Sequence, residues 1–145
     1  MFVSLILLVF PGKSLCYQLP AMMLPGVTLV VSPLISLMHD QIEHLRSAGI
    51  AAHTINASTS VSQMNRIVND ILAEHDDACK LLYVSPEKLA KSKTLLERLS
   101  ELHDARLLAR IVIDEAHCAS TWGHDFRPDY AQLSLVKLFA FCFFS

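Results

Sequence analysis

Two short groups of polar residues stand where apolar stretches of the sequence end, and their side chains could do chemistry on phosphates. The first group, Gly12-Lys13-Ser14, follows the apolar run 1–10. A glycine, an ammonium group and a hydroxyl at the start of a helix offer backbone N–H groups, a positive charge and a magnesium ligand to a polyphosphate. The triplet is a weak signal by itself, because glycine-lysine-hydroxyl sequences are common.

The second group, Asp114-Glu115-Ala116-His117, comes directly after the apolar stretch 107–113. An aspartate at the end of a strand can hold the Mg²⁺ of a nucleotide, and the next glutamate can polarise the attacking water. With the phosphate-binding triplet, these residues would complete the parts that hydrolysis of a nucleoside triphosphate requires. The two groups together are therefore far more specific than either one.

The hydrophobic pattern predicts a scaffold that brings such groups together. Strand-like stretches alternate with helical periodicity: strands are expected at 1–10, 27–31, 50–55, 81–84 and 107–113, and helices after Ser14 and at 34–48, 60–75 and 87–102. Strands that alternate with helices pair in parallel through right-handed crossovers, and ligands bind at the carboxyl ends of such strands. The sequence thus predicts an α/β fold with a mostly parallel sheet flanked by helices.

Local residue types predict several helix ends and core positions. Ser32-Pro33 and Ser85-Pro86 are each typical of a capping serine with proline in the first helical turn. Gly49 is expected in the left-handed conformation that ends a helix. The methionines 22, 23 and 38 are interpreted as core residues.

Composition excludes several classes of protein. The chain has 145 residues, of which 52% are hydrophobic and 18% charged, and its formal charge is −2. It is too apolar to be disordered and long enough for one folded domain. Because the chain is not basic overall, any nucleic-acid contact must come from a local patch.

The cysteine spacing predicts no structural zinc, and the apolar ends predict neither a membrane span nor a signal peptide. Cys16, Cys79, Cys118 and Cys142 form no C-x-x-C pair, which favours reduced thiols inside a cell and no structural zinc. Both apolar ends are shorter than the roughly 20 residues of a membrane span. Since no basic residue precedes Lys13, we expect no signal peptide and no secretion.

Four segments resemble successive motifs of the RecQ family of DNA helicases, in the family's order. They are GKSLCYQLPA at 12–21, VVSPLISLMHDQ at 30–41, LLYVSPEKL at 81–89 and DEAHCASTWGHDFRPDY at 114–130. The last is the most specific, because an aromatic-rich loop directly after D-E-A-H distinguishes RecQ enzymes from other helicases. The resemblance implies a RecA-like P-loop NTPase lobe, ATP hydrolysis with Mg²⁺ and 3′-to-5′ unwinding of DNA in recombination and repair.

The resemblance also implies roles for single residues. Gly12 and Lys13 would hold the phosphates, Ser14 and Asp114 would bind Mg²⁺, and Glu115 would be the catalytic base. His117 would sense the γ-phosphate and connect it to DNA. The residues expected to contact single-stranded or forked DNA are Ser32, Pro33, Trp122, Phe126 and Arg127, whose rings and guanidinium suit stacking on bases.

The chain departs from the family at both ends. Val9-Phe10-Pro11 stands where such helicases usually have Thr-Gly-x, and Pro11 has no N–H to donate to phosphate. We therefore divide the chain into an unmatched end at 1–11, a partial helicase lobe at 12–137 and an unmatched apolar tail at 138–145. A lobe incomplete at both ends, without the second lobe that supplies the arginine finger, is expected to hydrolyse ATP weakly or not at all and not to unwind DNA alone.

Two other interpretations remain. The chain could be a non-enzymatic remnant that binds DNA or associates with a full-length helicase or repair proteins. An unrelated P-loop kinase is disfavoured by D-E-A-H and its aromatic continuation. A helicase fragment of this kind is expected in the nucleus of a eukaryote, or otherwise in the cytoplasm.

Overall fold

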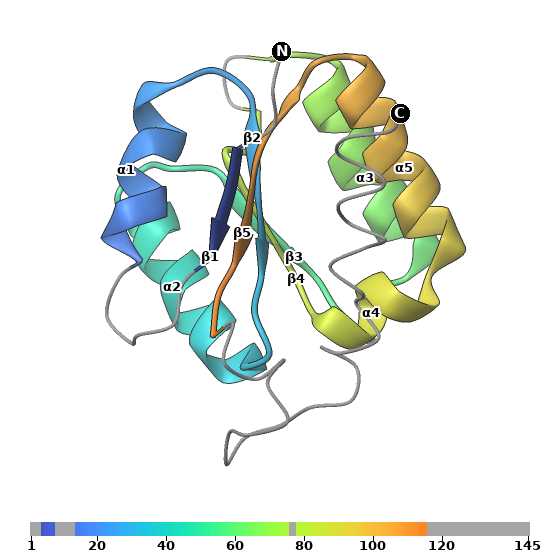
Figure 1. Cartoon of the computed structure of the whole chain (residues 1–145), viewed down its shortest axis with the longest axis horizontal. Coiled ribbons are helices and arrows are strands. Elements are labelled where there is room, and N and C mark those ends of the chain that lie inside the picture. Colours follow the sequence, from blue (N-terminus) through green and yellow to red (C-terminus); the bar gives the residue numbers. More distant parts are fainter. Residues whose placement is uncertain (1–3, 8–13, 76–77, 116–145) are drawn as a thin grey trace.

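The computed structural model describes residues 4–7, 14–75 and 78–115, which form a parallel sheet between two layers of helices (Figure 1). The strands are β1 (Ser4–Leu7), β2 (Val27–Val31), β3 (Ala52–Ile55), β4 (Leu81–Val84) and β5 (Leu108–Ile113). The helices are α1 (Leu15–Met23), α2 (Ile35–Ser47), α3 (Val61–Leu72), α4 (Pro86–Lys91) and α5 (Lys93–Asp104). The five strands have the order β1-β5-β2-β4-β3, and every neighbouring pair is parallel. The predicted α/β fold is confirmed.

The helices cover the two faces of the sheet unequally. Helices α1 and α2 lie on one face, and α3, α4 and α5 lie on the other (Figure 1). Every residue of β2 and β5 is buried, which explains their uninterrupted apolar sequences. The cluster under α1 and α2 contains Tyr17, Ala21, Val30, Met38, Ile42, Leu45, Ala52, Leu81, Tyr83 and Val112.

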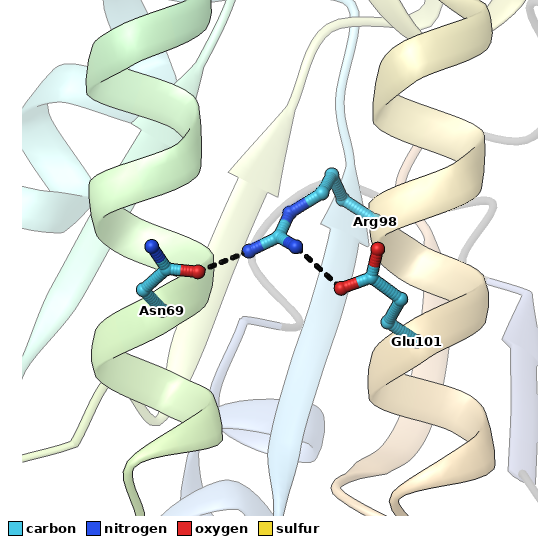
Figure 2. A network of polar contacts seen from close by, with 3 residues as sticks. All are labelled: Asn69, Arg98 and Glu101. Carbon is cyan, nitrogen blue, oxygen red and sulfur yellow. Dashed lines mark hydrogen bonds and ion pairs between the residues drawn. The ribbon is translucent and has the colours of Figure 1, made fainter.

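A polar contact joins two helices of the other layer. Arg98 of α5 donates to the side-chain oxygen of Asn69 on α3 and pairs with Glu101 on its own helix (Figure 2). Exposed ion pairs contribute at most about 1 kcal/mol, so the buried residues between the helices and the sheet hold this layer together. The contact joins α3 and α5 within this layer of the scaffold.

Serine side chains cap the starts of α3, α4 and α5, and the sequence predicted the cap at Ser85. Ser60 and Gln63 form a capping box at α3, with each side chain accepting from the other residue's N–H at 3.2 and 2.9 Å. Ser85 caps α4 by accepting from Lys88 N, and Pro86 occupies the first helical position. Both arrangements satisfy N–H groups that a helix start leaves without partners.

Two predicted helix boundaries are wrong. The helix expected at 87–102 is two helices, because the Ser92 side chain accepts from Leu95 N and begins α5 there. Ser32 is not a cap, since α2 begins at Ile35 with Leu34 in the capping position. Ser32 N–H instead donates to Val84 O at 3.2 Å, so this residue still extends the sheet.

The prediction that the methionines fill the core is correct only for Met38. Met38 is 1% exposed, whereas Met22 is 48% and Met23 74% exposed. The sequence of α1 is apolar on nearly every side, but only the face carrying Tyr17 and Ala21 is buried. A short helix on a sheet buries one stripe of side chains, and the remainder stays outside.

Candidate functional site

The carboxyl ends of all five strands lie level with one another at one edge of the sheet. Val31 of β2 is opposite Ile113 of β5 on one side and Val84 of β4 on the other. Leu7 of β1 is opposite Ile113, and Ile55 of β3 is opposite Val84. The residues that follow the strands therefore leave the sheet along one row, where parallel α/β sheets bind their ligands.

Asp114 follows β5 directly, so it leaves the row between β1 and β2. Its N–H donates to Val31 O at 2.9 Å, so the sheet ladder still holds the first residue beyond the strand. Strand β1 pairs with the other side of β5, and the chain leaving β1 contains the Gly12-Lys13-Ser14 triplet. The structure thus places the two strands that lead into the predicted groups next to each other.

The backbone turns sharply at the two acidic residues. Glu115 has φ +54°, in the left-handed region, and its N–H donates to Asp114 Oδ1 at 3.0 Å. A residue other than glycine adopts this conformation at a cost of about 1–2 kcal/mol. The turn keeps both half-buried carboxylates at the sheet edge and fixes the orientation of the Asp114 side chain.

Ser14 is the first described residue of the predicted phosphate-binding triplet. It has helical angles, and its C=O accepts from Gln18 N at 2.9 Å, so it belongs to the first turn leading into α1. Among the described residues no side chain caps α1 or α2, whereas serines cap α3, α4 and α5. The N–H groups at a helix start attract anions, so the first turns of α1 and α2 are suited to phosphate.

The segment between β2 and α2 has its polar side chain buried. Ser32 is 1% exposed, and its hydroxyl has no hydrogen-bond partner among the described residues. Pro33 is also buried, while Leu34 and Ile35 are 40% and 45% exposed. In this conformation the start of α2, rather than the Ser32 hydroxyl, faces solvent.

A buried polar network beneath this edge was not predicted from the sequence. Tyr17 OH donates to Gln41 Oε1 at 2.8 Å and lies 3.4 Å from Tyr83 OH, which accepts from Gln18 Nε2 at 3.3 Å. Burial raises the pKa of both tyrosines, and the nearby Asp114 carboxylate raises each further. The only sequence signal was a tyrosine and a glutamine shortly after Ser14, which helical periodicity alone does not distinguish from packing residues.

The remaining predicted site residues lie outside the described ranges. These are Gly12, Lys13, His117, Trp122, Phe126 and Arg127. Within the described ranges no group of three or more His, Cys, Asp or Glu side chains could hold a metal ion. The oxygen donors of Ser14 and Asp114 nevertheless suit Mg²⁺, which usually takes one or two protein ligands and completes its shell with phosphate and water.

Two further features of the described part bear on function. None of its helices combines the length and apolarity needed to cross a membrane. A hollow of about 530 Å³ lies at the amino ends of β3 and β4, away from the carboxyl edge. It is lined by Met22, Arg46, Gly49, Ile50, Ala51, Ala78 and Lys80.

Comparison with known proteins gives a consistent result. The family model described as DEAD/DEAH box helicase matches residues 11–145. The chain is 53% identical over 126 residues to ATP-dependent DNA helicase Q-like 2 of Arabidopsis thaliana, covering 87% of this chain and 18% of the relative. It is 49% identical to ATP-dependent DNA helicase Q1 of Pongo abelii and 52% identical to helicase Q-like 4B of Arabidopsis thaliana, again over 87% of this chain but 19% and 11% of theirs.

These matches confirm the resemblance to RecQ helicases that the motifs indicated, and the sheet with its flanking helices is that of a RecA-like α/β lobe. The chain spans about a fifth or less of the length of these relatives.

Proposed function

Because the chain belongs to the DEAD/DEAH box helicase family, we propose that it binds ATP with Mg²⁺ and acts as part of a RecQ-like ATP-dependent DNA helicase. The observation that carries the proposal is the junction of β1, β5 and β2. There Asp114 and Glu115 leave the sheet beside the strand that leads into the Gly12-Lys13-Ser14 triplet. A site of this composition can bind a triphosphate and activate water against it.

Each residue of the nucleotide site has a proposed task. Gly12 and Lys13 hold the phosphates, and Ser14 and Asp114 provide oxygen ligands to Mg²⁺. Mg²⁺ held by these two residues would neutralise charge that develops on the phosphate oxygens. Glu115 orients and deprotonates the attacking water. The hydrogen bond from Glu115 N–H to Asp114 Oδ1 supports the role of Asp114, because it fixes the orientation of that carboxylate.

DNA binding is proposed at two places. The first is the start of α2, after Ser32 and Pro33, where no described side chain caps the helix and its N–H groups suit a DNA phosphate. The second is the aromatic-rich loop with Trp122, Phe126 and Arg127, whose side chains suit stacking on unpaired bases. His117, between the two acidic residues and this loop in the sequence, is proposed to connect γ-phosphate and DNA.

The full activity is a proposal for a longer assembly. We propose action on single-stranded or forked DNA in recombination and repair, in the nucleus where the source is a eukaryote. The chain alone is expected to hydrolyse ATP very slowly. This sequence shows one lobe, and Val9-Phe10-Pro11 offers fewer flexible backbone donors than glycines would.

A second candidate function is binding to a partner helicase or repair protein without catalysis. The exposed apolar side chains of α1 favour it, since Leu15 and Met23 are each 74% exposed and Leu19 is 54% exposed. Large apolar side chains gathered on one exposed helix often mark an interaction site. Failure to bind nucleotide, together with retained binding to a partner, would favour this second candidate.

Binding of a fluorescent ATP analogue to the purified chain tests the nucleotide site. We expect binding that needs Mg²⁺, that weakens at least about tenfold in Lys13→Ala through loss of a charged contact, and that survives in Glu115→Gln. Glu115→Gln is the matched control, because it removes the proposed base while keeping the side-chain volume. Equal binding by the wild type and Lys13→Ala would overturn the proposal.

Fluorescence anisotropy of labelled single-stranded DNA tests the proposed DNA binding. Trp122→Ala is expected to weaken binding by roughly tenfold, because stacking on one base contributes about 1–3 kcal/mol. If the wild-type chain binds DNA but no nucleotide, and Trp122→Ala loses the DNA binding, the result would support a non-enzymatic remnant. No binding at low salt would refute a DNA-binding role for this chain.

A further inference from the structure

A chain of hydrogen bonds connects three elements beneath the candidate nucleotide site. Tyr17 and Gln18 come from α1, Tyr83 from β4 and Gln41 from α2. Both tyrosines are 0% exposed, although each carries a polar hydroxyl. A buried hydroxyl without a partner costs about 1–3 kcal/mol, so these contacts offset the cost of burying the two tyrosine hydroxyls.

The directions of the hydrogen bonds follow from the number of protons. Tyr17 has one hydroxyl proton and donates it to Gln41 Oε1 at 2.8 Å. The 3.4 Å contact between the two hydroxyls must then use the proton of Tyr83. Gln18 Nε2 donates to the Tyr83 oxygen at 3.3 Å. Each hydroxyl therefore donates once and accepts once. The continuous chain starts at Gln18 on α1, passes through Tyr83 on β4 and Tyr17 on α1, and ends at Gln41 on α2.

The helices that carry Tyr17 and Gln41 begin at the two predicted ligand contacts. Tyr17 is three residues beyond Ser14, in the first turn of the helix that follows the phosphate-binding triplet. Gln41 is in the middle of α2, the helix that begins just after Ser32 and Pro33. Helices α1 and α2 lie on the same face of the sheet (Figure 1).

A hydrogen bond can transmit a small helix movement that apolar packing absorbs. Apolar contacts beneath α1 and α2 involve Ala21, Met38 and Ile42. Such contacts tolerate sliding by a fraction of an ångström, whereas a 2.8 Å hydrogen bond weakens steeply once its geometry is lost. A phenylalanine at position 17 would fill the same volume, so the hydroxyl is required for the polar connection alone.

We propose that the Tyr17–Gln41 hydrogen bond is a positioning contact that couples nucleotide binding at the start of α1 to the conformation of α2. This inference rests on the proposed function, which places ATP at the first helix and DNA at the second. By linkage, the same contact makes DNA at α2 favour nucleotide at α1. Tyr17 and Gln41 touch neither ligand, so they act through the two helices.

Hydrogen exchange of backbone amides, with and without ATP and Mg²⁺, tests the coupling in the whole chain. In the wild type we expect nucleotide to slow exchange in both α1 and α2. In Tyr17→Phe we expect slowing in α1 with none in α2. Gln41→Leu removes the acceptor from the other side and should have the same effect, which guards against a folding defect in one variant.

Two control variants separate coupling from packing. Gln41→Glu keeps an acceptor oxygen at the end of the side chain and should preserve the slowing in α2. Tyr83→Phe removes the neighbouring hydroxyl but leaves the Tyr17–Gln41 contact, so α2 should still respond. A merely structural role for Tyr17 predicts uniformly faster exchange without nucleotide and an unchanged nucleotide response.

The outcomes distinguish this inference from the proposed function. Slowing in α1 but not in α2 of the wild type, or an equal α2 response in the wild type and Tyr17→Phe, would refute the coupling while leaving nucleotide binding intact. No slowing in either helix of the wild type would refute the proposed function and the coupling with it. Loss of the α2 response in both Tyr17→Phe and Gln41→Leu, with retention in Gln41→Glu, would establish the contact.

Discussion

Two glycines with positive φ offer a matched test of how the amino ends of β2 and β5 are packed. Gly26 has φ +87° and Gly49 has φ +77°, so alanine is strained in both places. A Cβ at Gly26 would lie 2.8 Å from Ala109 Cβ and 2.8 Å from Leu107 O. A Cβ at Gly49 would meet nothing within 4 Å. We expect Gly26→Ala to destabilise the protein much more than Gly49→Ala.

The magnitude follows from adding the backbone and steric costs. The left-handed conformation costs an alanine about 1–2 kcal/mol, and the lower entropy of the unfolded alanine chain returns about 0.4–1 kcal/mol. Gly49→Ala should therefore lower the free energy of unfolding by about 1 kcal/mol. At Gly26 the oxygen of Leu107 cannot withdraw freely, because it accepts from Val27 N–H at 2.7 Å. Overpacking of this kind adds about 1–3 kcal/mol, for a total of about 2–4 kcal/mol.

Urea unfolding followed by circular dichroism measures both losses. The two variants share the backbone penalty, so the difference between their midpoints reports the steric cost at Gly26, provided that the slope m is unchanged. Equal losses would refute the steric argument. A negligible loss in Gly49→Ala would show that the end of α2 leaves the left-handed conformation at little cost.

Two further predictions concern pH and helix capping. Burial raises the pKa of Tyr17 and Tyr83, and raises that of the Cys79 thiol from 9.0 to about 12, so the folded state keeps protons that the unfolded state loses. The contribution of these groups to the free energy of unfolding should be fully present below about pH 9. Above that pH, the free energy of unfolding should fall by up to about 1.4 kcal/mol per pH unit for each group, and the fall above about pH 10 should be smaller in Tyr17→Phe. A free energy of unfolding that stays constant between pH 9 and 11 in urea titrations would contradict this. Ser60→Ala should lower the free energy of unfolding by about 1 kcal/mol, because it removes the capping box of α3. Ser47→Ala, at an exposed position, is the control and should change it by less than about 0.5 kcal/mol. Equal urea midpoints for the two variants would refute the capping argument.

Local sequence predicted most of the elements, because each stretch carries its own periodicity and end signals. The strand at 81–84 was predicted with the bounds that β4 has, and Ser85-Pro86 predicted the start of α4. The same approach failed at Ser92, where an isolated serine divides two helices whose apolar spacing runs on without interruption. It also failed at Ser32, because pairing with β4 carries the extended backbone past the end of β2.

The candidate site was predicted in outline. Asp114 was expected at the end of a strand, and β5 ends at Ile113 directly before it. The turn at Glu115 and the hydrogen bond between these acidic residues could not be predicted, since both depend on how the chain leaves the finished sheet. The other proposed residues of the site that lie outside the described ranges stay predictions.

The sequence by itself determined the order of strands and helices and the polar groups at the strand ends, because these follow from neighbours a few residues apart. Only the tertiary structure decided that β5 lies between β1 and β2, and that one side of α1 is buried while Met23 is exposed. It also decided that the hydroxyls of Tyr17 and Tyr83, 66 positions apart, meet in the core. Pairing and burial at such separations depend on how whole elements pack, and no local pattern in the chain specifies them.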